Sequence, residues 1–210
     1  MTAAELRTLA AAWAERFAAE RERLGRLDAA TGDGDHGAGM QRGFARARTA
    51  VDAVSGDDDV GAVLTAAGKG LMSGVGGASG ALFATVLLEI GKAAAGADTL
   101  AVTHLATGTD AAVDRIGRLG RSAPGDKTML DALAPAAESL AADIDDDVPG
   151  SLVAAADAAE RGAEATRDLP ARHGRARHVQ GAGVGHVDPG AVSLALLLRV
   201  WAEVAAGGDA

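Results

Sequence analysis

Apolar side chains recur along this chain at steps of three and four residues, and this spacing constrains the fold more than any other feature. Leu6, Leu9, Trp13 and Phe17 form one such series, which places them on a single face of a helix. No segment shows the sustained alternation of β-branched residues that is typical of a strand. The sequence therefore predicts an all-α fold, with eight helices at residues 3–24, 37–51, 60–72, 81–90, 99–119, 126–142, 151–167 and 192–204.

Short links between consecutive helices favour an antiparallel up-and-down barrel or bundle. Four unusual stretches follow the first, third, fifth and seventh expected helices, around residues 28–39, 73–80, 120–128 and 172–190. In an antiparallel arrangement these four stretches lie at the same end of the molecule. We therefore expect a single domain over residues 1–210, with a glycine-rich, aspartate-rich and arginine-bearing site at one pole.

Composition limits the classes of function that are open to the chain. The formal net charge of −9 disfavours sequence-independent binding to nucleic acid or to an anionic membrane, because both need a basic face. Cysteine is absent, which excludes disulfides and thiolate metal sites. No apolar run approaches the roughly 20 residues that span a bilayer, and the N-terminus lacks the regions of a signal peptide. These features favour a cytoplasmic protein.

The stretch from Asp28 to Gly39 contains Asp28, Asp33, Asp35 and His36 among four glycines. Three close carboxylates repel one another unless a cation lies between them, and oxygen ligands favour magnesium or calcium over zinc. Glycines let backbone N–H groups approach a ligand, so a metal beside such a backbone indicates a phosphate-bearing ligand. The alternative interpretation is a solvated Asp/Gly turn that caps the next helix.

Two formal motif matches in this stretch fail because their context is wrong. The GxGxxG pattern at Gly32–Gly37 requires a preceding strand, whereas a helix is expected before it. An EF-hand that starts at Asp33 would place Phe44 at its twelfth position, where calcium needs a bidentate glutamate. Two further acidic runs, 57–59 and 145–147, lack nearby histidine and are interpreted as solvated turns.

The other stretches carry weaker signals when each is taken alone. Ser73–Gly80 is typical of a helix end and turn or, if it lies opposite a metal site, of a phosphate cradle at a helix N-terminus. By their chemistry alone, Lys127 and Arg175 are interpreted as solvent-exposed side chains and Met129 as a core residue. Asp188 is interpreted as a helix cap, because a proline follows it.

Taken together, five motifs resemble one known family in their order and spacing. They are Leu27-Asp28, Gly32-Asp33-Gly34-Asp35-His36-Gly37, Gly76-Gly77-Ala78-Ser79-Gly80, Pro124-Gly125-Asp126-Lys127-Thr128-Met129 and Gly185-His186-Val187-Asp188-Pro189-Gly190. The family is that of the L subunit of dihydroxyacetone kinase, and the resemblance covers most of the chain. It implies an eight-helix antiparallel barrel that binds ADP or ATP at one end.

The resemblance also implies roles for individual residues. Asp28, Asp33 and Asp35 would hold two magnesium ions that bridge the nucleotide phosphates. Arg175 would close over the site on a mobile lid as a phosphate contact, and no residue would act as a covalent catalyst. The other nucleotide-binding positions that the resemblance implies are His36, Gly37, Ala38, Gly39, Gly77, Ala78, Ser79, Gly120, Thr128, Met129, Asp188, Pro189 and Gly190.

Two positions depart from the family pattern. Gly39 stands where the family often has asparagine, so a side-chain hydrogen bond to the nucleotide is expected to be missing. Ala81 stands where proline is usual, which is expected to loosen the start of the following helix without abolishing binding.

The resemblance implies a phosphotransferase subunit that is inactive alone and passes the γ-phosphoryl group to dihydroxyacetone held on a K subunit. A chain of 210 residues favours the branch in which bound ADP is recharged from phosphoenolpyruvate through the M subunit of the phosphotransferase system. Two alternatives stay open. One is a separate subunit that exchanges ATP and serves dihydroxyacetone or another short ketose, and the other is a nucleotide-sensing module without turnover. Self-association also stays open.

Overall fold

The computed structural model describes residues 1–55, 59–142 and 147–207. Within them the regular structure is helical, apart from an isolated β-bridge between Thr2 and Thr99. The α-helices are α1 (Ala3–Ala19), α2 (Arg21–Ala29), α3 (His36–Asp52), α4 (Val60–Val75), α5 (Gly77–Ala93), α6 (Val102–Gly120), α7 (Leu130–Ala142), α8 (Val148–Ala165) and α9 (Pro189–Ala205). Three 3-10 turns, η1 (Thr166–Asp168), η2 (Ala176–His178) and η3 (Gln180–Gly183), lie between α8 and α9. The all-α prediction is confirmed.

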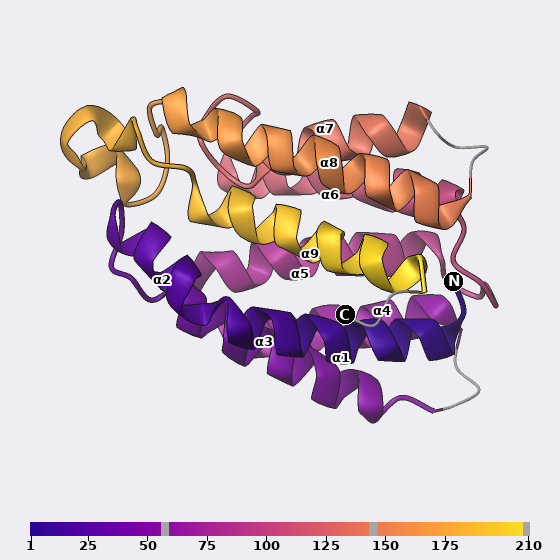
Figure 1. Ribbon diagram of the computed structural model, residues 1–210. Coiled ribbons are helices and arrows are strands. Elements are labelled where there is room, and N and C mark those ends of the chain that lie inside the picture. Colours follow the sequence, from indigo (N-terminus) through magenta and orange to yellow (C-terminus); the bar gives the residue numbers. More distant parts are fainter. Residues whose placement is uncertain (56–58, 143–146, 208–210) are drawn as a thin grey trace.

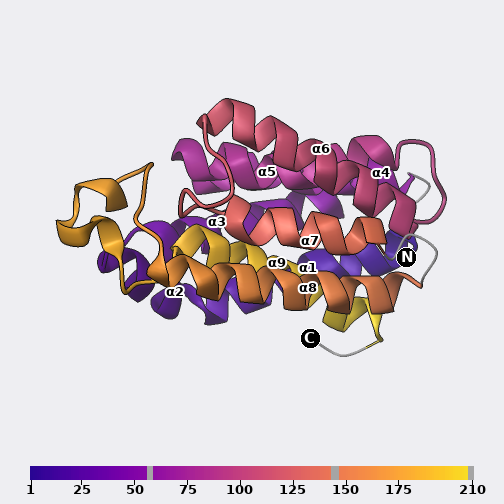
Figure 2. The same ribbon diagram turned by 90° about the horizontal axis from the view of Figure 1, so that it is seen from above.

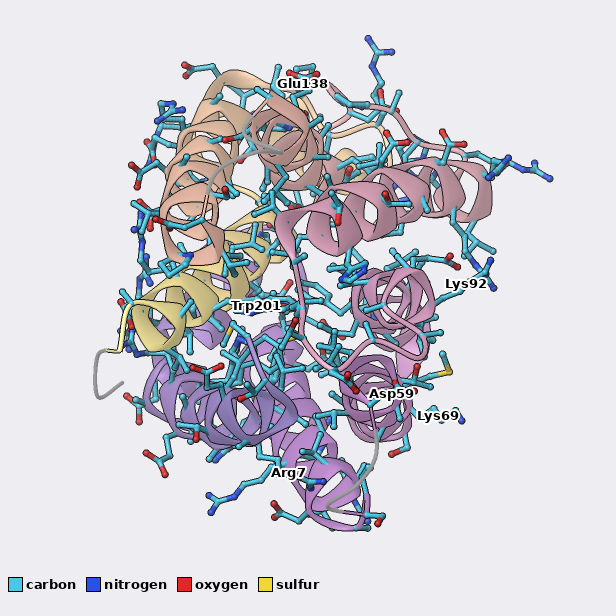
Figure 3. All side chains as sticks on the ribbon, turned by 90° about the vertical axis from the view of Figure 1, so that its right-hand side faces the viewer. Arg7, Asp59, Lys69, Lys92, Glu138 and Trp201 are labelled. Carbon is cyan, nitrogen blue, oxygen red and sulfur yellow. The ribbon has the colours of Figure 1, made fainter. Side chains whose placement is uncertain are left out.

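From α2 onward the helices run alternately up and down the long axis of the molecule (Figures 1 and 2). From α3 to α8, each helix packs against the helix that follows it. Helix α1 contacts α3, α4 and α9, so it lies between the first and last members of this series. Figure 3 looks along this axis from the end that carries the N-terminus, where the helices surround a packed interior. The links that follow α2, α4, α6 and α8 therefore gather at the opposite end, as the order of the helices predicts.

The first expected helix is divided in two, and this differs from the prediction of one helix over residues 3–24. Glu20 ends α1 and precedes α2, and α2 packs against the start of α3. Gly37 permits this packing, because a Cβ atom there would lie 2.0 Å from the carbonyl oxygen of Arg21. The break at Glu20 thus brings α2 onto α3, with Asp28 near its end.

Five helices begin three or four residues away from the predicted position, and side-chain hydrogen bonds explain two of these differences. The carboxylate of Asp131 accepts hydrogen bonds from the backbone N–H groups of Gly125 and Thr128, so residues 123–129 form a turn and α7 begins at Leu130. Asp147 accepts from the N–H of Gly150, so α8 begins at Val148 instead of residue 151. The other three are α5, α6 and α9, which begin at Gly77, Val102 and Pro189.

The acidic runs at 57–59 and 145–147 lie in part outside the described residues. Where they are described, each supplies a helix cap. Asp59 accepts hydrogen bonds from the N–H groups of Ala62 and Gly96, at 2.7 and 3.0 Å, and Asp147 caps α8. These carboxylates therefore satisfy backbone donors at the end of the molecule opposite the glycine-rich stretches.

Aromatic side chains from three helices meet in the core. The rings of Phe17 and Phe44 stack with centroids 3.9 Å apart, and Trp13 meets Trp201 edge-on at 5.3 Å. The indole Nε1 of Trp13 donates a hydrogen bond of 3.0 Å to the carbonyl oxygen of Leu197, which satisfies the buried polar atom. The rest of the core is mainly alanine, leucine and valine.

None of the helices in the described ranges has both the length and the apolar character that a membrane span requires.

Candidate functional site

A cavity of about 850 Å³ lies at the end of the molecule where α2, α4, α6 and α8 finish. All four stretches that the helix order places at one pole contribute to its walls. The predicted site residues that line it are Asp28, Asp35, His36, Gly39, Gly77, Ser79, Gly120, Thr128, Met129, Arg175, Asp188, Pro189 and Gly190.

Three carboxylates converge on one side of this cavity. One oxygen atom from each of Asp28, Asp33 and Asp35 lies within 4.8 Å of the others. Asp28 is half-buried at the end of α2, whereas the other two are exposed in the turn before α3. Gly32 leaves room for this arrangement, because a Cβ atom there would lie 2.3 Å from Oδ1 of Asp28. A set of three close carboxylate oxygens fits a hard divalent cation such as magnesium.

Two helices begin at the cavity without a hydrogen bond from an N-cap side chain. These are α3, preceded by Asp35, and α5, preceded by Gly76. Gly76 and Gly77 adopt φ values of 75° and 60°, and no atom lies within 4 Å of the place where either Cβ would stand. Side-chain caps occur instead on α1, α4, α8 and α9, from Thr2, Asp59, Asp147 and Asp188. In α3 the N–H of His36 donates to Asp28, and the remaining N–H groups at these two helix N-termini favour an anionic ligand beside the carboxylates.

His36 stands between α3 and α9. Its Nε2 lies 2.8 Å from Oγ of Ser193, and its backbone N–H donates a hydrogen bond of 3.2 Å to Oδ2 of Asp28. Burial lowers the pKa of the His36 imidazole, so the ring is neutral at neutral pH. These two contacts hold the turn before α3, which carries Asp33 and Asp35, against Asp28 and α9.

The segment between α8 and α9 extends beyond the helices at the same end as the cavity (Figure 1). From this segment, Nη1 of Arg175 reaches Oδ1 of Asp33 at 2.8 Å. Nearer the root of the segment, Nε2 of His173 lies 3.1 Å from Oδ2 of Asp126. The N–H of Arg172 donates to the carbonyl oxygen of Asp126 at 3.2 Å. The segment is thus tied to two separate aspartates, Asp33 and Asp126.

Lys127 corrects the expectation of a surface lysine. Its side chain is only 3% exposed, and its Nζ donates hydrogen bonds to the carbonyl oxygens of Thr166 and His186. These carbonyls lie where the chain leaves α8 and where it approaches α9, so one lysine joins both ends of the connecting segment. Burial lowers the pKa of the Lys127 ammonium group.

Another part of the cavity lining comes from the end of α6, the residues before α7 and the start of α9. Met129 is 5% exposed and belongs to the hydrophobic core, as expected, while it also lines the cavity. Asp188 caps α9 by accepting a hydrogen bond of 2.7 Å from the N–H of Ala191. Burial raises the pKa of the Asp188 carboxyl group to about 6.

Four predicted site residues are not among the side chains that line the cavity. Asp33 lies beside it and meets Arg175, while Gly37 packs against α2. Ala38 is half-buried in the first turn of α3, and Ala78 belongs to the first turn of α5. Gly37 is thus explained by helix packing.

Sequence reasoning missed several residues that line or support the cavity. Some lie at ordinary helical positions and Thr31, Ser122 and His173 lie in the links between helices, so the sequence carries no separate signal for them. They are Thr31, Arg42, Leu82, Phe83, Ile116, Ser122, His173 and Ser193.

The chain is similar to known proteins over most of its length. The DAK2 domain model matches residues 30–203. The chain is 43% identical to a D-erythrulose kinase of Mycolicibacterium smegmatis over 195 residues, which are 91% of this chain and 34% of that relative. It is 37% identical to the ADP-binding subunit DhaL of the PEP-dependent dihydroxyacetone kinase of Escherichia coli, covering 90% of both chains.

A solved structure shares the fold. The dihydroxyacetone kinase from C. freundii, in complex with AMP-PNP and Mg²⁺, aligns with a TM-score of 0.68 and 27% sequence identity over 96% of this chain. The chain spans about a third of that kinase and of the erythrulose kinase, but nearly the whole of the E. coli subunit. The chain therefore belongs to the family of DAK2 domains.

Proposed function

We propose that the cavity binds ADP or ATP with Mg²⁺, and that the chain is the nucleotide-binding subunit of a kinase for dihydroxyacetone. The observation that carries this proposal is the meeting of three carboxylates with two uncapped helix N-termini in one cavity. The carboxylates suit the metal, and the free N–H groups suit the phosphates. The names of the E. coli subunit and of the C. freundii complex support the same ligands.

In this proposal Asp28, Asp33 and Asp35 hold two magnesium ions, which neutralise phosphate charge when they are bound. The backbone at the starts of α3 (His36–Gly39) and α5 (Gly77–Ser79) lines the phosphates, with the N–H groups of Gly37 and Ala38 as the donors from α3, and Arg175 closes over them. The nucleoside lies against the opposite wall. That wall consists of Gly120, Thr128, Met129, Asp188, Pro189 and Gly190.

The proposal requires a second protein to bring the acceptor. Phosphoryl transfer depends mainly on positioning and charge neutralisation, and no side chain of this chain is assigned as a nucleophile. Exposed apolar side chains lie near the cavity end on α4, α6 and the α8–α9 segment, and they suit a docking face: Met72, Leu119, Val179 and Val184. The partners proposed are a K subunit that holds dihydroxyacetone and an M subunit of the phosphotransferase system that recharges bound ADP.

A second candidate is a subunit that exchanges free ATP and serves a different short ketose. The 43% identity to a D-erythrulose kinase favours this candidate. The two candidates differ in the nucleotide that the purified protein retains. A recharged subunit keeps ADP through purification, whereas an exchanging subunit loses its nucleotide.

Absorbance tests this difference first. The chain has two tryptophans and no tyrosine, so retained nucleotide raises the ratio of absorbance at 260 nm to that at 280 nm visibly. Acid release and chromatography identify the nucleotide, and the first candidate predicts ADP.

Coupled turnover tests the proposal as a whole. The chain is mixed with K and M subunits, phosphoenolpyruvate and dihydroxyacetone, and dihydroxyacetone phosphate is measured. In parallel it is mixed with ATP, a K subunit and either dihydroxyacetone or erythrulose. Nucleotide binding without product in any mixture would contradict the kinase proposal and favour a nucleotide-sensing module.

A further inference from the structure

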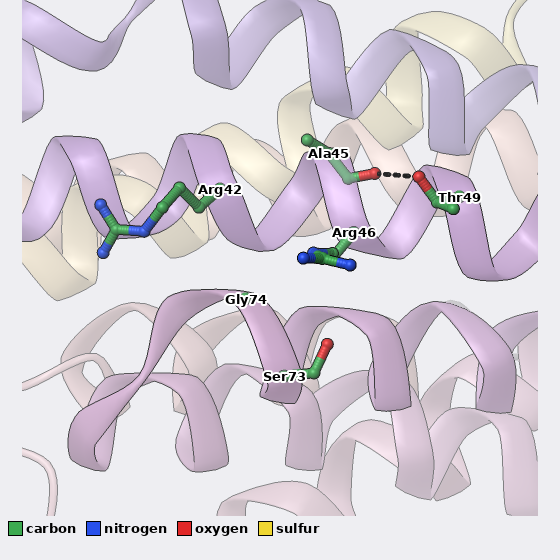
Figure 4. Close-up of a pocket in the computed structure, with 6 residues that line it drawn as sticks. All are labelled: Arg42, Ala45, Arg46, Thr49, Ser73 and Gly74. Atoms are coloured by element: carbon green, nitrogen blue, oxygen red, sulfur yellow. Dashed lines mark hydrogen bonds between the residues drawn. The ribbon is translucent and has the colours of Figure 1, made fainter.

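A second hollow adjoins the cavity along the outer surface of α3 and α4. It has a volume of about 470 Å³ and is lined by Arg42, Ala45, Arg46, Thr49, Ser73 and Gly74 (Figure 4). Arg42 lines both this groove and the main cavity, whereas Arg46, one turn further along α3, lines the groove alone. In Figure 4 the Arg42 side chain extends along α3 in the direction away from Arg46, while the Arg46 guanidinium group lies between the two helices.

The two arginines are free of acidic partners. In the described ranges neither Arg42 nor Arg46 lies within 4.0 Å of a carboxylate oxygen, although the chain carries a net charge of −9. Arg48 on the same helix does have such contacts, at 3.8 Å from Glu15 and 3.9 Å from Asp52. Arg42 can therefore bind an anion without first breaking an ion pair.

Gly39 and the Arg42 guanidinium group are neighbours in the lining of the cavity. A Cβ atom at Gly39 would stand 3.9 Å from Nη2 of Arg42 and 3.5 Å from the carbonyl oxygen of Val75. These are ordinary van der Waals distances, and Arg42 lines the same cavity as Gly77, where α5 begins. A planar guanidinium group at this place matches a phosphoryl group in geometry and charge.

The packing of the helices indicates which phosphate is reached. Helix α3 packs on α4, α4 on α5, and α5 on α6. Gly120 ends α6 and Met129 precedes α7, so α4 and α5 separate both residues from α3 in this order. A nucleotide whose nucleoside lies at that wall would pass the start of α5 and end on the α3 side. The group nearest Arg42 is then the last phosphate.

Resting on the proposed nucleotide site, we propose that Arg42 contacts the terminal phosphoryl group of a bound nucleoside triphosphate. The contact is a charge-assisted hydrogen bond from the guanidinium group to a γ-phosphoryl oxygen. ADP lacks this group, so Arg42 distinguishes the triphosphate from the diphosphate.

Calorimetric titration tests the assignment, with Mg²⁺ present and with AMP-PNP and ADP as separate ligands. Arg42→Gln is expected to weaken AMP-PNP binding by at least tenfold and ADP binding by less than twofold. The matched control is Arg46→Gln, which alters the same helix and groove and is expected to leave both affinities within twofold of the unaltered chain.

Three results would overturn the assignment. They are an unchanged affinity for AMP-PNP in Arg42→Gln, an equal loss for both ligands, and the same loss in Arg46→Gln. Thermal denaturation of all three proteins identifies any general loss of folding. Failure of the unaltered chain to bind either nucleotide would instead contradict the proposed function, so the two failures are distinguishable.

Discussion

Nη1 of Arg175 lies 2.8 Å from Oδ1 of Asp33, which joins the α8–α9 segment to the carboxylate cluster. Both side chains are largely exposed, at 69% and 42%. Exposed ion pairs contribute only about 0–1 kcal/mol, so this contact holds the segment weakly. Any cation that binds the three carboxylates competes with the guanidinium group for Asp33, and Arg175 is then free to meet a phosphate.

Substitution of Arg175 tests the role of this contact. Arg175→Gln removes the guanidinium group, and we expect the dissociation rate of a fluorescent ADP analogue with Mg²⁺ to rise by about three- to tenfold. Arg177→Gln is the control, because Arg177 lies on the same segment and contacts only His178 among the described residues. Rapid mixing with excess unlabelled ADP measures both rates, and equal rates in the two variants would contradict the role given to Arg175.

Lys127 is expected to stabilise the fold through its two carbonyl partners. Lys127→Met keeps the apolar part of the side chain but leaves the carbonyl oxygens of Thr166 and His186 without their donor. The bond to Thr166 is buried and that to His186 only partly buried, and an unsatisfied buried group costs about 1–3 kcal/mol, so we expect the free energy of unfolding to fall by at least about 1 kcal/mol. Lys69→Met, at an exposed position on α4, is expected to change it by less than about 0.5 kcal/mol. Urea denaturation measures both, and similar values for the two variants would show that Lys127 has no such role.

Asp188 predicts a specific dependence of stability on pH. Burial raises its pKa from 3.8 to about 6, which means that the folded state binds the proton more tightly than the unfolded state. The contribution of Asp188 to stability is therefore greatest below pH 3.8 and falls as the pH rises to about 6. Lys127, which favours the charged carboxylate, and Asp131, which opposes it, are the main neighbouring charges.

Asp188→Asn isolates this effect, because asparagine also caps helices but does not titrate. The unfolding free energies of the two proteins are compared in the absence of metal and nucleotide. The difference between them, unaltered chain minus variant, is expected to decline with rising pH across this window. Parallel curves would show that Asp188 titrates normally.

Two glycines at the start of α3 are expected to respond in opposite ways to alanine. A Cβ atom at Gly37 would lie 2.0 Å from the carbonyl oxygen of Arg21, so Gly37→Ala forces α2 away from α3. We expect a loss of about 2 kcal/mol or more in the free energy of unfolding. At Gly39 the nearest atom would lie at 3.5 Å, and Gly39→Ala is expected to be neutral or to stabilise by up to about 1 kcal/mol. Equal losses would mean that α2 does not pack against Gly37 in this way.

The sequence predicted the helices and the pole of the site because both depend on local spacing and chain order. Apolar steps of three and four locate a helix wherever it packs, and the order of antiparallel helices fixes which links share an end. Contacts between distant segments were not predictable in this way. The division at Glu20 depends on Gly37, and the burial of Lys127 depends on carbonyl groups 39 and 59 residues away.

Some residues of the site can be predicted from the local sequence, whereas others can be found only from the tertiary structure. Asp28, Asp33 and Asp35 were recognisable because their clustering in the sequence is itself unusual. Arg42 and Ser193 occupy ordinary helical positions, and only the packing of α3 on α4 and on α9 brings them to the cavity or to His36. Predictions for such residues need the tertiary structure.

The most direct test of the account is the affinity of Mg²⁺-ADP for Asp33→Asn, measured by calorimetry beside Asp52→Asn. Asp52 is an exposed aspartate at the far end of α3, and its substitution changes the net charge equally. We expect Asp33→Asn to weaken binding by at least tenfold, or about 1.4 kcal/mol, and Asp52→Asn to have little effect. The loss should disappear when magnesium is removed, which separates the metal from the Arg175 contact. Equal affinities in the two variants would contradict the assignment of the carboxylate cluster as the metal site.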